Sequence, residues 1–398
     1  MDILEVSINN TIDNPDKLQR LLGEFEQQNN VKVDLQVFDW ADAWMEFIRI
    51  SLYRYGPAIS ETGDTWMGSL TSRNCLRPFK REEIAAIGGG DVFLGEMWKS
   101  CQDFDSHATV AIPWSLDTYL AYYRRDMLKK AGVDEKTAFS NVGAFEAMLK
   151  SLQDAGVEIP LAISTGGNSS NILHNASSWV WAMGGDFITP DGKKTLFTQP
   201  ETLAGLQKYF SLYRFMPKTA QGLDDDNMIQ MFVNEGAAVA LANPPLLYEI
   251  RHRTVPLALI QNIGVAVQPG VPFVGGSNLI IWGHVPVRQE SAAVHFIQYL
   301  TSAELMLKLF QNTGLIPARM DVLDQLETDP VYSPMAESLK TGRAFKHLRL
   351  WGLVEDKLTK ALTKIWKTIF STPKPDLPQI IYDTLSPLEG RLNTILSE

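Results

Sequence analysis

The sequence predicts an α/β protein with two domains, in which strands alternate with helices. Short apolar, β-prone runs are each followed by a segment whose apolar residues recur with helical spacing. Strand–helix–strand repeats of this kind indicate mostly parallel sheets with helical crossovers. A chain of 398 residues is also too long for one ordinary hydrophobic core, which indicates more than one domain.

The first strand–helix–strand repeat lies at the start of the chain. Residues 3–8 are apolar and predict a strand. Asn14 followed by Pro15 predicts a helix N-cap and first helical position, because proline lacks only an N–H that would be unpaired there. Apolar residues at helical spacing follow over 18–25, and residues 31–37 alternate as a second strand.

Further elements follow in the middle of the chain. Residues 109–113 predict a strand that ends before Trp114, and residues 119–124 predict the next one. The apolar spacing over 145–152 predicts a helix. Residues 161–164 form another short strand that runs into a loop rich in Gly, Asn and Ser.

The second half of the chain continues the alternation. Residues 237–242 predict a small buried strand, and the Pro- and Gly-punctuated stretch 268–276 predicts a crossing between domains. Thr301 with Glu304 has the spacing of a capping box that begins a helix. The tail from Met335 onward is expected to be mostly helical.

Composition excludes some classes of partner. The net charge is −10 and there is no long basic run, which argues against nucleic acid and anionic membrane as partners. No apolar run approaches the length of a membrane-spanning helix. The two cysteines, Cys75 and Cys101, could pair, but buried free thiols are the favoured interpretation.

No catalytic or cofactor signature is present. The six histidines are scattered, and no metal-ligand spacing of His or Cys occurs, so neither a metal nor a cofactor is predicted. The three glycines 88–90 lack the Lys and Ser/Thr of a phosphate-binding loop. The three aspartates 224–226 are interpreted as a helix N-terminus. A carboxylate pair for sugar hydrolysis stays open, because separation in space is not visible in a sequence.

Tryptophan placement points to binding. Several of the ten tryptophans follow strand-like runs or stand beside Asp, Gly, Ser or Asn, where an indole on a loop could stack against a flat, hydroxylated ligand such as a sugar. Four other tryptophans lie in strand-like or helical runs and are expected to pack within the protein: Trp44, Trp98, Trp282 and Trp366.

At this point the chain resembles the extracellular solute-binding proteins of ABC importers, the large group typified by maltose-binding protein. The resemblance covers nearly the whole length, and the order of its blocks carries it. The matching blocks are residues 63–66 with 76–79, 111–118 with 121–132, 181–186 with 191–200, 274–278, 292–300 and 314–319.

The resemblance implies two α/β lobes of a periplasmic-binding-protein fold, joined by hinge segments near Pro113, Gly270 and Pro317. The N-terminal lobe would consist of residues 1–112 and 271–317, and the C-terminal lobe of residues 113–270 and 318–398. It also implies a monomer that delivers a carbohydrate to the permease subunits of the importer. Such a protein is periplasmic or extracellular, either free or anchored as a lipoprotein, although no export signal precedes the first strand.

The resemblance assigns the ligand to a cleft between the lobes. Aromatic faces would stack on sugar rings, and Asp117 and Asn243 would bind hydroxyl pairs. Asp117 could instead cap a turn, and the glycines before Ser277 could form only a tight bend. The expected ligand-binding residues are Asn10, Trp40, Trp66, Trp114, Asp117, Asn168 in the 165–171 loop, Trp179, Asn243, Gly276, Ser277 and Trp351.

Two other functions remain open for this sequence. The same fold could bind another small solute or a polyamine, and a polyamine would need several carboxylates converging on its ammonium groups. A two-lobed glycoside-acting enzyme would need two essential acids and would turn its ligand over.

Overall fold

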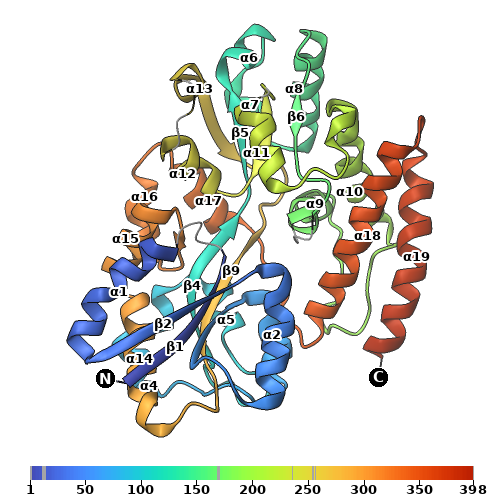
Figure 1. Ribbon diagram of the computed structural model, residues 1–398. Coiled ribbons are helices and arrows are strands. Elements are labelled where there is room, and N and C mark those ends of the chain that lie inside the picture. Colours follow the sequence, from blue (N-terminus) through green and yellow to red (C-terminus); the bar gives the residue numbers. More distant parts are fainter. Residues whose placement is uncertain are drawn as a thin grey trace. The chain divides into compact units, whose positions relative to one another are not determined.

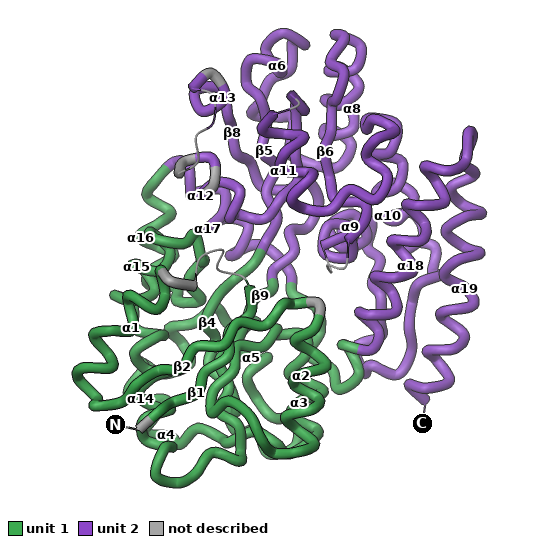
Figure 2. The backbone as a smooth tube through the Cα atoms, viewed as in Figure 1, with its two compact units in different colours: residues 1–117, 275–329, 344–352 green, residues 118–274, 330–343, 353–398 purple. Residues whose placement is uncertain are grey.

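The computed structural model describes the chain except for residues 1, 11–14, 168–170, 235, 253–254, 256 and 398. It folds into two compact units, which Figure 2 distinguishes by colour. Unit 1 consists of residues 1–117, 275–329 and 344–352, and unit 2 of residues 118–274, 330–343 and 353–398. The division expected from the sequence differs from these units at residues 113–117, 271–274, 318–329 and 344–352. In the structure helix α16 (Met320–Glu327) packs against α15 (Ala303–Thr313) and β10 (Ile316–Pro317), all within unit 1.

Unit 1 contains a six-stranded sheet with the strand order β10-β4-β9-β3-β1-β2. β1 (Asp2–Asn9) pairs in parallel with β2 (Val31–Phe38) and with β3 (Ile59–Gly63). β9 (Val274–Ile281) is antiparallel to β3, and β10 is antiparallel to β4 (Ala111–Thr118). The other helices of unit 1 are α1 (Pro15–Asn29), α2 (Trp40–Tyr53), η1 (Asp64–Trp66), α3 (Met67–Thr71), α4 (Arg81–Ala86), η2 (Gly90–Val92), α5 (Gly95–Ser100) and α14 (Val287–Leu300).

Unit 2 contains a four-stranded sheet with the order β6-β7-β5-β8. β6 (Leu161–Ala162) and β7 (Val239–Ala242) are parallel, whereas β5 (Leu120–Arg124) is antiparallel to both β7 and β8 (Ile263–Val267). The two long C-terminal helices α18 and α19 lie side by side in Figure 1. The helices are α6 (Arg125–Lys130), α7 (Glu135–Ala138), α8 (Val142–Asp154), α9 (Asn171–Ala182), α10 (Pro200–Phe210), η3 (Ser211–Phe215), η4 (Lys218–Ala220), α11 (Asp225–Val233), α12 (Pro245–His252), α13 (Leu257–Asn262), α17 (Ser333–Thr341), α18 (Trp351–Ser371, whose first two residues belong to unit 1) and α19 (Leu377–Leu396).

The predicted α/β class, with two sheets flanked by helices, is confirmed. The expectation of mostly parallel sheets is corrected, because both sheets are mixed. The crossover rule holds only for consecutive strand–helix–strand units, and β1, β2 and β3 obey it. β5 follows β4 after the single residue Tyr119, and β9 enters the first sheet after a long excursion, so no helical crossover sets their direction.

The observed starts of three helices can be compared with the starts predicted from the sequence. α1 begins at Pro15 as predicted, and the expected cap Asn14 lies outside the described residues. Asp224 caps α11 through a bond from the Asn227 N–H at 2.8 Å, which confirms the interpretation of the three aspartates as a helix start. The capping-box prediction at Thr301 is wrong by one residue. Ser302 is the N-cap of α15, and the Thr301 hydroxyl donates to the Ile297 carbonyl of the preceding helix.

Cys75 and Cys101 are free and buried, as favoured from the sequence. Burial raises the pKa of the Cys75 thiol to about 11 and that of Cys101 well above its ordinary value. Trp282 and Trp366 are fully buried, in agreement with the packing role predicted for them. Among the described residues, no helix combines the length and the apolar character needed to cross a membrane.

Candidate functional site

Polar and aromatic residues gather at one edge of the unit 1 sheet. The carboxyl ends of the parallel strands β1, β2 and β3 share this edge, and the chain leaves them at Asn10, Asp39 and Asp64. β9 is antiparallel to β3 and pairs Ser277 with Gly63, so the first residues of β9 lie at the same edge. We call this set of residues the unit 1 edge.

Asn10 fixes the entry into α2. Its backbone N–H donates to the Phe38 carbonyl at 2.9 Å, and its side-chain nitrogen donates to an Asp39 carboxylate oxygen at 3.2 Å. The Asn10 side-chain oxygen accepts the backbone N–H of Trp40 at 3.1 Å. Because both ends of the amide are engaged with the β2–α2 turn, Asn10 positions the first residue of α2, which is Trp40.

Three half-buried tryptophans form a cluster at this edge. The Trp66 ring centroid lies 5.3 Å from that of Trp40 and 5.6 Å from that of Trp44, and the buried Phe47 ring lies behind it at 5.9 Å. Trp44 is helical, as expected, but it belongs to this cluster. Its spacing of four residues from Trp40 on one helix face was the available signal. We call Trp40, Trp44 and Trp66 the indole cluster.

The turn after β3 meets the start of β9 beside the cluster. The Gly276 N–H donates to an Asp64 carboxylate oxygen at 3.3 Å. A Cβ at Gly276 would lie 2.1 Å from the carbonyl oxygen of Ser115, so the close approach of β4 and β9 requires glycine here. The buried Ser115 and Ser277 hydroxyls are hydrogen-bonded at 2.7 Å and join the same two strands.

A buried carboxylate lies beneath the unit 1 edge. Glu61 in β3 is 1% exposed, and the backbone N–H of Asn9 donates to its carboxylate at 2.8 Å. The Asn9 side chain donates to the Glu61 carbonyl at 3.1 Å. Hydrogen bonds of this kind compensate the cost of burying polar groups, and they lock the ends of β1 and β3 together. Glu61 could not be predicted from the sequence, because an acidic residue beside the polar Ser60 and Thr62 gives no sign of its partner.

Unit 2 has its own polar edge at the carboxyl ends of β6 and β7. Ser164 follows β6, and Asn243 follows β7 directly. β5 is antiparallel to β7, so Tyr119, which precedes β5, lies at this edge. β8 is antiparallel to β5, so Gln268, which follows β8, lies at the same edge. We call these four residues, with the side chains they bind, the unit 2 edge.

A carboxylate organises the unit 2 edge. The Ser164 hydroxyl and the Asn171 side-chain amide both donate to Asp225, and the Tyr119 hydroxyl donates to the Asn171 side-chain oxygen. Hydrogen bonds to an ionised carboxylate are stronger than neutral ones, so this network fixes three side chains at once. The sequence predicts Asp225 only as part of a helix start. The sequence carries no signal that distinguishes it from its two neighbours.

Two predicted loop tryptophans lie elsewhere. Trp114 lies inside β4 and Trp179 inside α9, and each is 1% exposed, so the prediction that they lie on loops is wrong. Trp179 packs against Tyr209 at 5.5 Å and Phe145 at 6.2 Å in the core of unit 2. The Gly/Asn/Ser-rich loop ends sooner than predicted, because α9 already begins at Asn171.

The remaining predicted residues occupy varied positions. Trp351 is the first residue of α18, is 2% exposed and packs against Phe345 at 4.6 Å. Asp117 is half-buried near the end of β4. Asn243 is half-buried, and its carbonyl accepts the Tyr122 hydroxyl at 3.3 Å. Asn168 lies outside the described residues.

The unit 1 edge combines the two kinds of group that contact small ligands, which are aromatic rings and hydrogen-bonding polar groups. It presents half-exposed indoles next to carboxylate, amide and backbone N–H groups. Indole faces bind flat apolar surfaces, and the polar groups bind hydroxyls. Within the described part of the chain, no group of three His, Cys, Asp or Glu residues could hold a metal ion.

Aromatic and polar side chains at the carboxyl edges of the sheets occupy the place where α/β proteins commonly bind small molecules. Residues 21–334 match the family of bacterial extracellular solute-binding proteins. The chain belongs to this family.

One curated relative and several solved structures are similar to the chain. The sn-glycerol-3-phosphate-binding periplasmic protein UgpB of Pectobacterium atrosepticum is 24% identical over 287 residues, which cover 67% of this chain. The aligned part spans 62% of the length of that relative.

The structural neighbours share the fold over nearly the whole chain. An ABC transporter solute-binding protein of Thermotoga lettingae with bound α-D-tagatose has a TM-score of 0.82 at 19% identity, with 100% of each chain covered. Maltose-bound MalE3 of T. maritima has a TM-score of 0.83 at 19% identity, covering 98% of this chain and 100% of the other. The sugar-binding protein MalE of Xanthomonas citri has a TM-score of 0.81 at 18% identity, covering 99% and 97%. The fold of this chain is therefore the two-lobed periplasmic-binding-protein fold.

Proposed function

We propose that this protein is the substrate-binding component of an ABC importer and that it captures a sugar or oligosaccharide. The observation that carries the proposal is the indole cluster beside the carboxylate of Asp64. Indoles stack on sugar rings, and carboxylates accept hydrogen bonds from hydroxyl groups. The indole cluster and Asp64 together supply both kinds of contact. Structural neighbours bind α-D-tagatose, maltose and laminaribiose, which supports the same ligand class.

The residue roles in this proposal differ. The indole cluster stacks on the ligand, and Asp64, Asp117 and Asn243 serve its hydroxyl groups. The N–H of Gly276 already donates to Asp64 and holds that carboxylate in place. Asn10 and Ser277 act indirectly, because their side chains already bind Asp39 and Ser115. Trp114, Trp179 and Trp351 are assigned to packing, in keeping with their burial, and Asn168 is retained as a ligand contact.

Calorimetry and tryptophan fluorescence against a panel of mono- and oligosaccharides test the proposal. We expect saturable binding of one sugar class, with the sugar recovered unchanged. Trp40→Ala should weaken that binding by at least about tenfold, since an aromatic contact contributes on the order of 1 kcal/mol beyond its buried area. Trp98→Ala is the matched control, because Trp98 stacks on Phe93 within unit 1 but outside the cluster. Absence of binding to every sugar would contradict the proposal.

The panel also addresses the two alternatives. Binding of spermidine alone would favour a polyamine carrier, and release of a cleaved sugar would favour a glycoside-acting enzyme. sn-Glycerol 3-phosphate belongs in the panel because the curated relative carries that name. We expect it to bind more weakly than neutral sugars, because the carboxylates of Asp39 and Asp64 at the unit 1 edge repel a phosphate dianion.

Partners and location follow from the same proposal. The protein acts as a monomer outside the cytoplasm, free or anchored as a lipoprotein, and passes its ligand to the transmembrane permease subunits. It needs no cofactor and performs no catalysis. Ligand-dependent stimulation of the reconstituted importer's ATPase would support this assignment, and equal stimulation with and without ligand would contradict it.

A further inference from the structure

Residues 344–352 belong to unit 1, and we call them the strap: 344–348 lie outside helices and strands, 349–350 form a turn and 351–352 begin α18. The strap lies against η1 and α3, the short helices that carry Trp66. A Cβ at Gly68 would be 2.3 Å from the Leu348 carbonyl oxygen, so the strap crosses α3 in direct backbone contact. The Ser69 hydroxyl donates to the Arg349 carbonyl at 3.1 Å.

The end of the strap reaches the indole cluster. A Cβ built on Gly352 would lie 3.8 Å from Cδ1 of Trp66 and 3.9 Å from the carbonyl oxygen of Thr65. The helical turn that presents Trp66 is therefore covered by a segment almost three hundred residues later in the chain. Any displacement of the strap removes this cover from Trp66.

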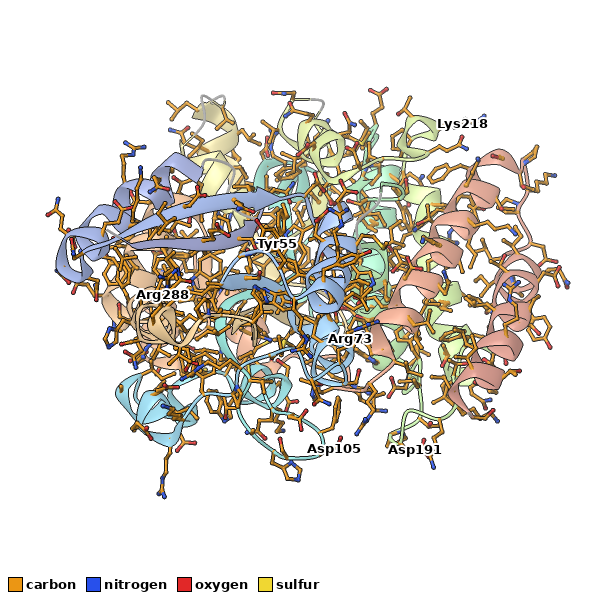
Figure 3. All side chains as sticks on the ribbon, turned by 60° about the horizontal axis from the view of Figure 1, so that its bottom comes forward. Tyr55, Arg73, Asp105, Asp191, Lys218 and Arg288 are labelled. Atoms are coloured by element: carbon orange, nitrogen blue, oxygen red, sulfur yellow. The ribbon has the colours of Figure 1, made fainter. Side chains whose placement is uncertain are left out.

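The strap is anchored on the loop 102–105. The His347 ring stacks on Phe104 with centroids 4.2 Å apart and planes at 10°, and its Nε2–H donates to the Gln102 carbonyl at 3.2 Å. The Arg349 guanidinium forms an ion pair with the Asp105 carboxylate at 2.5 Å, and it lies 5.5 Å from the centre of the same Phe104 ring. Figure 3 shows Asp105 at the periphery of the protein.

Charged groups occur on both segments that meet at His347. Asp103 and Asp105 lie on the loop, and Arg349 lies on the strap itself. Burial is the largest effect on the His347 ring and lowers its pKa, while the Gln102 carbonyl and the Asp103 charge oppose that shift. Bonds from Ser106 hold the pKa of Asp103 below its ordinary value, so Asp103 stays charged in mildly acidic solution. The docked strap therefore favours a neutral ring.

We propose that His347 is a positioning residue for ligand binding: its neutral ring docks the strap that supports Trp66, and its protonation loosens the strap. This inference rests on the proposed function. Protonation adds a positive charge to a half-buried ring that shares its aromatic contact with the Arg349 guanidinium. Ligand affinity should then fall in acid, although His347 does not touch the ligand.

The direction of the pH effect follows from the shifted pKa. Above the ordinary histidine pKa the ring is neutral whether or not the strap is docked. As the pH falls below that value, the undocked strap takes up the proton more readily, so docking weakens progressively. The weakening stops once the pH is below the lowered pKa of the docked ring. Each unit of difference between the His347 pKa in the docked strap and that in the undocked strap lowers the docking equilibrium constant by at most about tenfold.

Hydrogen–deuterium exchange tests the strap without any ligand. Peptides covering 344–352 and 64–71 are followed at about pH 7.5 and about pH 5.5, with correction for the intrinsic exchange rate. We expect protection to fall in acid in the wild-type protein. His347→Phe keeps the ring stack but cannot titrate, so its protection should stay the same at both pH values.

Two glycine variants calibrate the measurement. Gly68→Ala should displace the strap at every pH, because its Cβ would occupy the position of the Leu348 carbonyl oxygen. Gly23→Ala is the matched control, since a Cβ there meets no atom within 4 Å. Equal acid-induced loss of protection in the wild type and in His347→Phe would overturn the proposal. If Gly68→Ala is too unstable to study, the comparison of wild type with His347→Phe still decides.

Ligand affinity supplies the functional readout, with maltose or whichever panel sugar binds tightest. We expect binding to weaken by about threefold to tenfold between about pH 7.5 and about pH 5.5 in the wild type, and by less than twofold in His347→Phe. Parallel pH profiles for the two proteins would overturn the role of His347 in binding. No sugar binding at neutral pH would instead contradict the proposed function, and the exchange data would still test the strap.

Discussion

The indoles of Trp40 and Trp66 meet edge to face, with ring centroids 5.3 Å apart and planes at 61°. Trp40 follows β2 and Trp66 follows β3. Asn10 sets the position of Trp40, because its side-chain oxygen accepts the backbone N–H of Trp40. The arrangement depends on the parallel β1–β2–β3 pairing, which gathers the three turns at one edge. Five predictions concern this edge and other sites in the two units.

Asn10→Ala should lower the affinity for the sugar ligand by about tenfold and destabilise the protein by about 1 kcal/mol, because the α2 entry loses its hydrogen bonds. Calorimetric titration and urea unfolding measure the two effects. Asn141→Ala is the control, since Asn141 caps α8 in unit 2 through the N–H groups of Gly143 and Ala144. Equal losses of affinity in the two variants would argue against the positioning role of Asn10.

Gly276→Ala should destabilise unit 1 by about 1–3 kcal/mol, because the added Cβ would lie 2.1 Å from the Ser115 carbonyl oxygen. Thermal unfolding followed by circular dichroism measures the change. Gly95→Ala is the control, since a Cβ there meets no atom within 4 Å. A melting temperature unchanged from the wild type would show that β4 and β9 separate easily at this point.

Asp225→Ala should cost about 1–3 kcal/mol in the free energy of unfolding, because the Ser164 hydroxyl and the Asn171 amide lose their shared acceptor. The exposed neighbour Asp226 supplies the control variant Asp226→Ala. Denaturant unfolding measures both proteins. Equal effects of the two substitutions would mean that the aspartates contribute only through the N-terminus of α11.

Stability should depend on pH through Glu83. Its hydrogen bonds with Arg77 are the largest cause that lowers the Glu83 pKa, and the Arg77 side chain also binds Glu290 at 3.1 Å. The lowered pKa means that the stabilisation is present above the pKa of an unfolded glutamate and is lost as the pH falls through the folded value. Glu83→Gln should flatten the acid limb of the unfolding free energy. Glu82→Gln, at an exposed position of the same helical turn, should leave that limb unchanged.

The two thiols should react slowly in the folded protein. At about pH 8 a pKa of about 11 leaves Cys75 with on the order of a hundredfold less thiolate than an ordinary cysteine, and burial also raises the pKa of Cys101 and so lowers its thiolate fraction. Ellman's reagent should therefore modify neither thiol quickly until the protein is unfolded in guanidinium, when both react. Rapid modification of the native protein would mean that one of the thiols is accessible.

Several features of the fold are visible in local sequence. Alternating apolar strands and helical spacing are properties of neighbouring residues, so the α/β class, the start of α1 at Pro15 and the helical C-terminal tail could be predicted. The residues that leave β1, β2 and β3 could be predicted too, because parallel strands present their ends together. Pairing direction could not be predicted for β5 and β9, which no helical crossover constrains.

Local sequence was enough to predict the α/β class, the family and the turns that carry Asn10, Trp40 and Trp66. Which tryptophans are half-exposed and which are buried depends on the packing of distant segments, as Trp114 and Trp179 demonstrate. The tertiary structure also decided the roles of Glu61, Asp225 and His347. Their partners are distant in the chain, and burial and charge pairing depend on everything that packs around a residue, whereas local spacing records only the residue's immediate neighbours.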